Sequence, residues 1–165
     1  MIVVSDTSPL NYLILIEAID VLPQLYHEVY LPHQVITELE HHGAPAAVCR
    51  WVQHLPEWAR VRNPAHIDAT LLQNRKLDKG EIHAIALAQE LKAHVLIDER
   101  DAYEAAKARG LTSTGILGVL DAAAERDLLD LKPALDRLVS ETNFRHSLRL
   151  IDRLLERDAQ RRQTD

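Results

Sequence analysis

Short strand patterns that alternate with longer helical patterns constrain the fold of this chain more than any other feature. The clearest strand pattern is 2–5, a run of β-branched residues typical of a buried strand. Further strands are predicted over 28–31, 60–62, 94–97 and 112–113. Helical patterns occupy 9–18, 33–42, 44–54, 66–74, 79–92, 101–109, 115–126, 131–141 and 146–162. Because strands separated by helices pair in parallel, we predict an α/β fold, a three-layer α/β/α sandwich with a mostly parallel central sheet and a helical C-terminal extension.

Length and composition set limits on the class of protein. The 165 residues are predicted to form a single domain, 1–165, with a helical part from about 128 to 165. No apolar run approaches the roughly 20 residues that a membrane span needs. The start of the sequence lacks the basic and apolar regions of a secretion signal, so we expect a cytoplasmic protein.

The net charge and the cysteine content argue against further classes of protein. A net charge of -6 and a pI near 5.8 argue against binding to nucleic acid through bulk positive charge. Acidic residues gathered in a metal site contribute to that balance, however, and are neutralised when cations bind. The single cysteine, Cys49, excludes an internal disulfide framework and a thiolate metal cage.

The opening stretch MIVVSDTSPLNYL contains a carboxylate with no evident capping role. Ser8 and Pro9 fit an N-cap followed by proline at the first helical position. If Ser8 caps that helix, Asp6 stands alone at the carboxyl end of a buried strand. In open parallel sheets, the crevice at that edge is where ligands bind.

A second acidic residue lies in LDKGEIHAIALAQELKAHVLIDERDA. A helix from about Gly80 places Glu81 on the stripe of small and apolar residues that faces the sheet, and it places His83 and Glu90 on the outer, solvated side. The competing interpretation is a capping box, in which Asp78 and Glu81 satisfy each other's backbone N–H groups. Both roles coexist only if the Glu81 side chain moves.

A third acidic residue, Asp98, follows the strand pattern of Val95, Leu96 and Ile97. Two parallel strands that end in aspartate bring two carboxylates to one edge of the sheet, and Glu81 adds a third. Crowded carboxylates repel unless a cation lies between them, and hard oxygen ligands of this kind suit Mg²⁺ or Mn²⁺. Asp98 alternatively caps the helix that follows it.

The stretch LPHQVITELEHHG offers a fourth candidate. Glu38 and Glu40 flank the apolar face of the predicted helix at similar angles, and periodicity does not choose between them. His41 and His42 point to different faces of a helix, and this spacing argues against a zinc site.

Five arginines recur every four residues near the C-terminus: Arg145, Arg149, Arg153, Arg157 and Arg161. We interpret this stripe as a solvated face paired with the acids around it, namely Glu141, Asp152, Glu156 and Asp158. The alternative is contact with phosphates or with an acidic partner, for which Arg145 and Arg149 are the nucleic-acid candidates.

Four segments of the chain together resemble the PIN domain superfamily: VVSDTSPLNYL, VYLPHQVITELE, LDKGEIHAIALAQELKAHVLIDERDAYEAAKARGLTSTGILGVL and LKPALDRL. The most similar branch contains small prokaryotic proteins that are often the toxin of a toxin-antitoxin pair. The resemblance implies an acidic pocket formed by Asp6, Glu38, Glu81 and Asp98, in which Asp6, Glu81 and Asp98 bind Mg²⁺ or Mn²⁺. It selects Glu38 over Glu40.

The same resemblance implies lesser roles for other residues. Thr7 or Ser8 supports a water or a phosphate, and Glu99 and Asp101 compete with Asp98 for the place of the fourth acid, because many relatives have threonine and then a later aspartate or asparagine here. The implied function is a Mg²⁺- or Mn²⁺-dependent endoribonuclease, with an RNA substrate, a cognate antitoxin and a homodimeric state. The alternative is a non-catalytic PIN-like module that binds RNA or a protein.

Overall fold

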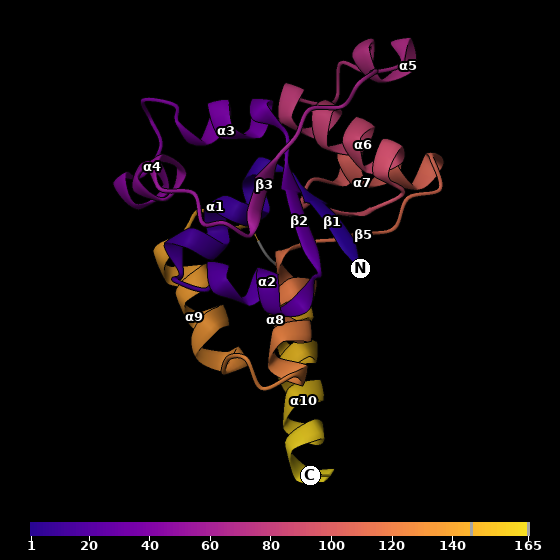
Figure 1. The fold of residues 1–165 in the computed structure, drawn as a ribbon. Helices are drawn as coiled ribbons and strands as arrows, with labels where there is room; N and C mark the ends of the chain where they lie inside the picture. The colour runs from indigo at the N-terminus through magenta and orange to yellow at the C-terminus, as the bar shows by residue number, and fades with distance from the viewer. Residues whose placement is uncertain (146, 165) are drawn as a thin grey trace.

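A computed structural model describes residues 1–145 and 147–164, and within these ranges five strands form one parallel sheet (Figure 1). The strands are β1 (Ile2–Ser5), β2 (Glu28–Leu31), β3 (Ala59–Val61), β4 (His94–Leu96) and β5 (Ser113–Thr114). They lie in the order β3-β2-β1-β4-β5, and each neighbouring pair is parallel. The predicted α/β/α sandwich is confirmed, and the sheet, predicted to be mostly parallel, is parallel at every described strand pair.

Helices form every connection between the strands. Between β1 and β3 lie α1 (Thr7–Leu15), η1 (Ile19–Val21), α2 (Leu22–Leu25), α3 (His33–Leu39) and α4 (Ala46–Gln53). Between β3 and β5 lie α5 (Ala69–Leu72), α6 (Lys79–Leu91) and α7 (Arg100–Ala108). The chain ends with α8 (Ile116–Glu125), α9 (Leu131–Glu141) and α10 (Leu148–Thr164).

The central strands β1 and β4 are buried on both faces, which explains their apolar runs. Val3 and Leu96 pack into one apolar cluster, with α1 to α4 and α8 to α10. Val4 and Val95 face the other way and pack into a second cluster, with α6 and α7. This alternation follows from the period of two along a strand and separates the helices into the two outer layers.

The C-terminal helices extend the first of these layers. Leu131, Leu135 and Leu138 of α9 are buried, as are Ile151 and Leu154 of α10. In Figure 1, α8, α9 and α10 gather at one end of the molecule, and α10 extends beyond the rest of the chain. No helix within the described ranges has the length and apolar character needed to cross a membrane.

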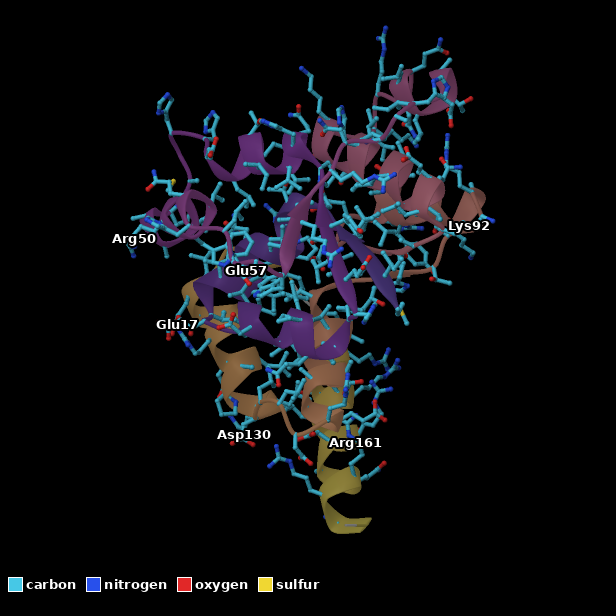
Figure 2. The ribbon with its side chains drawn as sticks, in the orientation of Figure 1. Glu17, Arg50, Glu57, Lys92, Asp130 and Arg161 are labelled. Carbon is cyan, nitrogen blue, oxygen red and sulfur yellow. The ribbon has the colours of Figure 1, made fainter. Side chains whose placement is uncertain are left out.

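Ion pairs attach α10 to the helices beneath it. Asp121 of α8 pairs with Arg157 and Arg161, and Asp130 pairs with Arg162 at 2.6 Å; Figure 2 labels Asp130 and Arg161 in this region. Of the predicted acidic partners, Asp158 pairs with Arg161 at 3.1 Å, whereas Glu141 pairs with Arg137, which lies outside the stripe. The main partner of Arg157 and Arg161 is Asp121 of α8, which was not predicted. Within the described ranges, Arg145 and Arg149 are exposed and form no ion pair.

Several element boundaries differ from the prediction. Helix α1 begins at Thr7 with Asp6 at the N-cap position, so the predicted cap at Ser8 is wrong; Pro9 is tolerated because it lies in the first turn, where no intrahelical N–H bond is lost. The short helices η1 and α2 were not predicted, since four residues are too few to show a helical period. Residue 146 of the predicted helix 146–162 lies outside the described residues.

The turn after α7 provides a test of backbone conformation alone. Gly110 has φ of +72°, and a Cβ built on it meets nothing within 4 Å. We therefore expect Gly110→Ala to lower the free energy of unfolding by about 1 kcal/mol through left-handed strain without a steric clash. Lys92, at φ 51° after α6, is the matched control, because Lys92→Gly relieves the same strain and should stabilise the protein. Urea unfolding measures both, and equal effects of the two substitutions would contradict this account.

Candidate metal centre

The candidate site lies where the order of the sheet reverses. From β1 the chain moves outward to β2 and β3, and it then crosses to β4 on the other side of β1. Asp6 directly follows β1, and its backbone N–H donates to the Leu96 carbonyl oxygen at 3.0 Å. Asp98 follows β4 after one intervening residue. Both aspartates therefore lie at the carboxyl edge of the sheet beside the switch point, the usual position of a ligand in open α/β folds.

Three carboxylates converge at this edge. Asp6, Glu38 and Asp78 each offer an oxygen, and these oxygens all lie within 4.8 Å of one another. Asp6 comes from the end of β1, Glu38 from α3, and Asp78 from the N-cap position of α6. The structure thus brings together side chains that are up to 72 positions apart in the numbering. Among the described residues, Glu81 and Asp98 are not part of this group.

The carboxylate of Glu38 is held by two other elements. The Thr7 hydroxyl, in the first turn of α1, donates to Glu38 Oε2, and the backbone N–H of Gly80 in α6 donates to Oε1 at 2.8 Å. A Cβ at Gly80 would lie 2.9 Å from Glu38 Cδ, so a larger residue would displace the carboxylate. Glu40, the alternative on the same helix, is exposed. The choice of Glu38 over Glu40 therefore agrees with the direction in which α3 presents these side chains.

Asp6 is the most buried acid of the group. Only 2% of the residue is exposed, and its Oδ1 has no hydrogen-bond partner among the described residues. Although Asp6 occupies the N-cap position of α1, its side chain makes no capping hydrogen bond. Burial raises its pKa well above the usual range, and the charges of Asp78, Glu81 and Glu38 raise it further, against a lowering contribution from the Thr7 backbone N–H.

Asp78 and Glu81 form the capping box that the sequence allowed. Asp78 Oδ1 accepts from the Glu81 backbone N–H at 2.8 Å, and Glu81 Oε2 accepts from the Asp78 backbone N–H at 2.8 Å. The capping hydrogen bond turns the Glu81 carboxylate back toward the Asp78 backbone, and Glu81 lies outside the converging group among the described residues. The capping box also places Asp78 at the site. The sequence predicts Asp78 only as a cap, and the signal for a second role is its position at the start of the helix that carries Glu81.

Glu81 is nevertheless part of the electrostatic environment. The residue is 3% exposed, and burial raises its pKa to about 7, with further contributions from the charges of Asp78, Glu99 and Glu38, against the lowering effect of the hydrogen bond from the Asp78 backbone. A carboxyl group with this pKa is partly protonated at neutral pH. Its environment thus favours a neutral group or a nearby cation.

Asp98 is oriented by another helix. Its Oδ1 accepts from the backbone N–H of Ile116 at 2.8 Å, and a Cβ at Gly115 would lie 2.8 Å from that oxygen. Asp98 therefore caps the start of α8, and the alternative of capping α7 is wrong because Glu99 occupies the N-cap position there. Its Oδ2 is buried without a partner among the described residues, and burial raises its pKa to about 6.

The remaining predicted residues differ in how far they are exposed. Ser8 is half-buried, while Glu99 and Asp101 are exposed at the start of α7. His83 was expected on the solvated side of α6, but it is half-buried and its Nδ1 has no partner in the described part of the chain. The reason is that α3 packs against α6 and covers this side of the helix.

The three converging acids fit a hard divalent cation. Their donors are all carboxylate oxygens, which are the ligands that Mg²⁺ and Mn²⁺ prefer. The buried, unpartnered oxygen of Asp6 is costly unless a cation or a proton satisfies it. A bound cation would also offset the mutual repulsion that raises the pKa of Asp6 and Glu81.

Comparison with known proteins gives one family and one fold. The model of a family described as PIN domain matches residues 2–160. The structure is similar to that of a PilT N-terminus domain protein from the hyperthermophilic archaeon Sulfolobus solfataricus, with 16% sequence identity, a TM-score of 0.50, and coverage of 88% of this chain and all of that one. At this identity the likeness concerns the fold. No curated protein matches the sequence.

The raised pKa of Glu81 predicts a pH-dependent stability. Between its ordinary value of 4.5 and about 7, the folded metal-free protein keeps a proton on Glu81 that the unfolded chain has released, so stability falls as the pH rises. We expect Glu81→Gln, which keeps the capping acceptor, to become more stable than the parent protein across this window, by roughly 2 to 3 kcal/mol at its upper end.

Urea unfolding of both proteins in EDTA measures this difference. His83 and His94, whose pKa values burial lowers, change stability in the opposite direction within the same window, but they contribute equally to both proteins and cancel. A difference between the two proteins that does not change with pH would contradict the proposed protonation of Glu81.

Proposed function

We propose that this chain, which belongs to the PIN domain family, is a metal-dependent ribonuclease that hydrolyses phosphodiester bonds in RNA. Proteins of this family commonly have nuclease activity. The observation that carries the proposal is the convergence of Asp6, Glu38 and Asp78, with one buried oxygen of Asp6 that lacks a partner. RNA as the substrate and Mg²⁺ or Mn²⁺ as the ion rest on the family resemblance and on the all-oxygen donor set.

Each residue of the site has a proposed role. Asp6, Glu38 and Asp78 hold the cation, and Thr7 and Gly80 fix the Glu38 carboxylate through their hydrogen bonds. Glu81 and Asp98, the other acids of the proposed site, lie at the same edge of the sheet, and a bound cation would favour their ionised forms. A divalent ion bound here supplies the charge that activates water for attack and stabilises the negative charge that develops on the phosphate.

The resemblance to toxins of toxin-antitoxin pairs extends the proposal to partners. We propose a cognate antitoxin and a homodimeric state, and both have direct tests. A short open reading frame that precedes or overlaps the gene supports the antitoxin, and light scattering of the purified protein measures its oligomeric state. A monomer with no neighbouring reading frame would remove this part of the proposal and leave the nuclease assignment in place.

A crystal soaked in Mn²⁺ tests the ligand set directly. We expect an anomalous difference peak between the carboxylates of Asp6, Glu38 and Asp78. A peak bonded to Glu81 in place of Asp78 would show that metal binding opens the capping box. The absence of any peak at this edge of the sheet, at a Mn²⁺ concentration that supports cleavage, would exclude the site.

Asp6→Asn should abolish metal-dependent cleavage. The substitution removes a buried negative charge that the cation needs, so we expect RNA cleavage in Mg²⁺ or Mn²⁺ to fall on the order of 100-fold or more. The fold should persist in EDTA, because the same change removes repulsion between carboxylates. Glu40→Gln is the control with the same change in charge, since Glu40 is exposed at the C-cap of α3. Full activity of Asp6→Asn would exclude the assignment, and no divalent-dependent cleavage by the parent protein would favour a non-catalytic binding module.

Substitutions at Asp78 separate its two roles. Serine caps a helix about as well as aspartate but carries no charge. Alanine neither caps the helix nor carries a charge. If Asp78 holds the ion, Asp78→Ser and Asp78→Ala should both lose Mn²⁺ affinity and cleavage by about 10- to 100-fold. Only Asp78→Ala should also lose about 1 kcal/mol of stability. Calorimetric titration with Mn²⁺ and urea unfolding measure the two effects, and normal Mn²⁺ affinity in Asp78→Ser would restrict Asp78 to capping.

A further inference from the structure

A short basic loop adjoins the acidic centre. Three cations, Arg75, Lys76 and Lys79, lie within three residues of Asp78 along the chain, and all three are exposed. Lys79 is the first residue of α6, and its charge acts on His83, which also feels the charge of Glu38. Lys79 therefore lies near the site that Asp6, Glu38 and Asp78 form, and Arg75 and Lys76 lie on the loop that leads into Asp78.

The loop is anchored at both ends. Leu71 and Leu77 are buried in the apolar cluster beneath α6, and 1% and 7% of these residues are exposed. Between them, the Asn74 side chain accepts from the Lys76 backbone N–H at 3.1 Å, and the Leu77 N–H donates to the Asn74 carbonyl oxygen at 3.2 Å. These contacts make a tight turn that presents Arg75 and Lys76 to solvent from a fixed base.

The three cations have no acidic partner although many acids are close. Other arginines of this chain form ion pairs, such as Arg62 with Glu90 at 2.7 Å and Arg109 with Asp68 at 3.4 Å. For Arg75, Lys76 and Lys79, the described part of the chain shows no ion pair and no side-chain hydrogen bond. Their charges thus remain available to a ligand, and they lie next to carboxylates that would otherwise repel a polyanion.

We propose that Arg75, Lys76 and Lys79 form a phosphate-binding arm that holds the backbone of a single RNA strand beside the metal centre, an inference that rests on the proposed ribonuclease function. A protein with net charge -6 needs local cations to bring phosphates to an acidic site. Aromatic residues make up only 4% of the chain, and none lies between Trp58 and Lys79, so the arm contacts phosphates and not bases. An acidic protein segment is the less suitable occupant, because it would bring carboxylates against the site's own carboxylates.

The test compares two triple variants with the same change in charge. R75Q/K76Q/K79Q removes the arm, and R50Q/K92Q/K107Q removes three exposed cations elsewhere. Figure 2 labels Arg50 and Lys92 on opposite flanks of the molecule, and Lys107 lies in the last turn of α7. Both triples are made in the Asp6→Asn background, so that binding is read without cleavage. Fluorescence anisotropy with a labelled, unstructured RNA oligonucleotide then gives the affinity as a function of salt.

The expected result is specific to the arm. R75Q/K76Q/K79Q should weaken RNA binding by about 10- to 100-fold at moderate salt and should reduce the slope of log affinity against log salt by about 2, because each contact to a single strand contributes about 0.7. The control triple should change the slope by well under 1. In the parent background, the arm variant should raise KM about 10-fold with little change in kcat, since the arm binds substrate away from the reacting bond.

The outcomes separate this inference from the proposed function. Equal slopes for the two triples would overturn the arm, whether or not the parent protein cleaves RNA. A parent protein that cleaves no RNA but shows the arm-specific slope would overturn the ribonuclease proposal and support the arm. If the arm variant loses binding to a poly-glutamate peptide but keeps full RNA affinity, the loop serves an acidic protein partner and the inference fails.

Discussion

The crowding of carboxylates around a buried aspartate is the constraint on which the rest of this site depends. Asp6 lies at the end of the central strand, where 2% of it is exposed and one oxygen has no hydrogen-bond partner among the described residues. Glu38 and Asp78 approach it to within 4.8 Å. Such an arrangement lowers stability unless a proton or a cation is present. The carboxylates of this site therefore need a proton or a cation to neutralise their charge.

The first turn of α6 connects the parts of the site. Asp78 and Glu81 cap this helix, and the Gly80 N–H, between them, donates to Glu38 from α3. The absence of a side chain at Gly80 lets the Glu38 carboxylate approach the backbone. The same few residues therefore cap the start of α6, orient the proposed metal ligand Glu38 and contribute a second one, Asp78. A change in the ionisation of one carboxylate is felt by the others through short hydrogen bonds and direct repulsion.

The cations of this chain fall into two groups, one that is ion-paired and one that is not. At the C-terminus, Arg157, Arg161 and Arg162 pair with aspartates and attach α10 to the helical layer. Near α6, the basic loop of Arg75, Lys76 and Lys79 forms no such pair with any residue that the structure describes. The regular arginine spacing was the more conspicuous pattern in the sequence, but the less regular loop lies beside the acidic centre. Regular spacing shows which residues share one face of a helix. It does not show which residues lie near a site, because that depends on the path of the loops.

The sequence by itself determined the layers of the fold and identified most of the carboxylates at the candidate site. Apolar runs such as 2–5 and 94–97 predicted strands buried on both faces. Because helices separate these strands, the sequence also predicted that they pair in parallel. It also placed Asp6 and Asp98 at one edge, because strand ends in a parallel sheet share a side. Only the tertiary structure decided which acids converge. Asp98 turned toward α8, Glu81 stayed in its capping box, and Asp78 joined Asp6 and Glu38. These outcomes depend on contacts between helices distant in sequence, about which the period of a single helix carries no information.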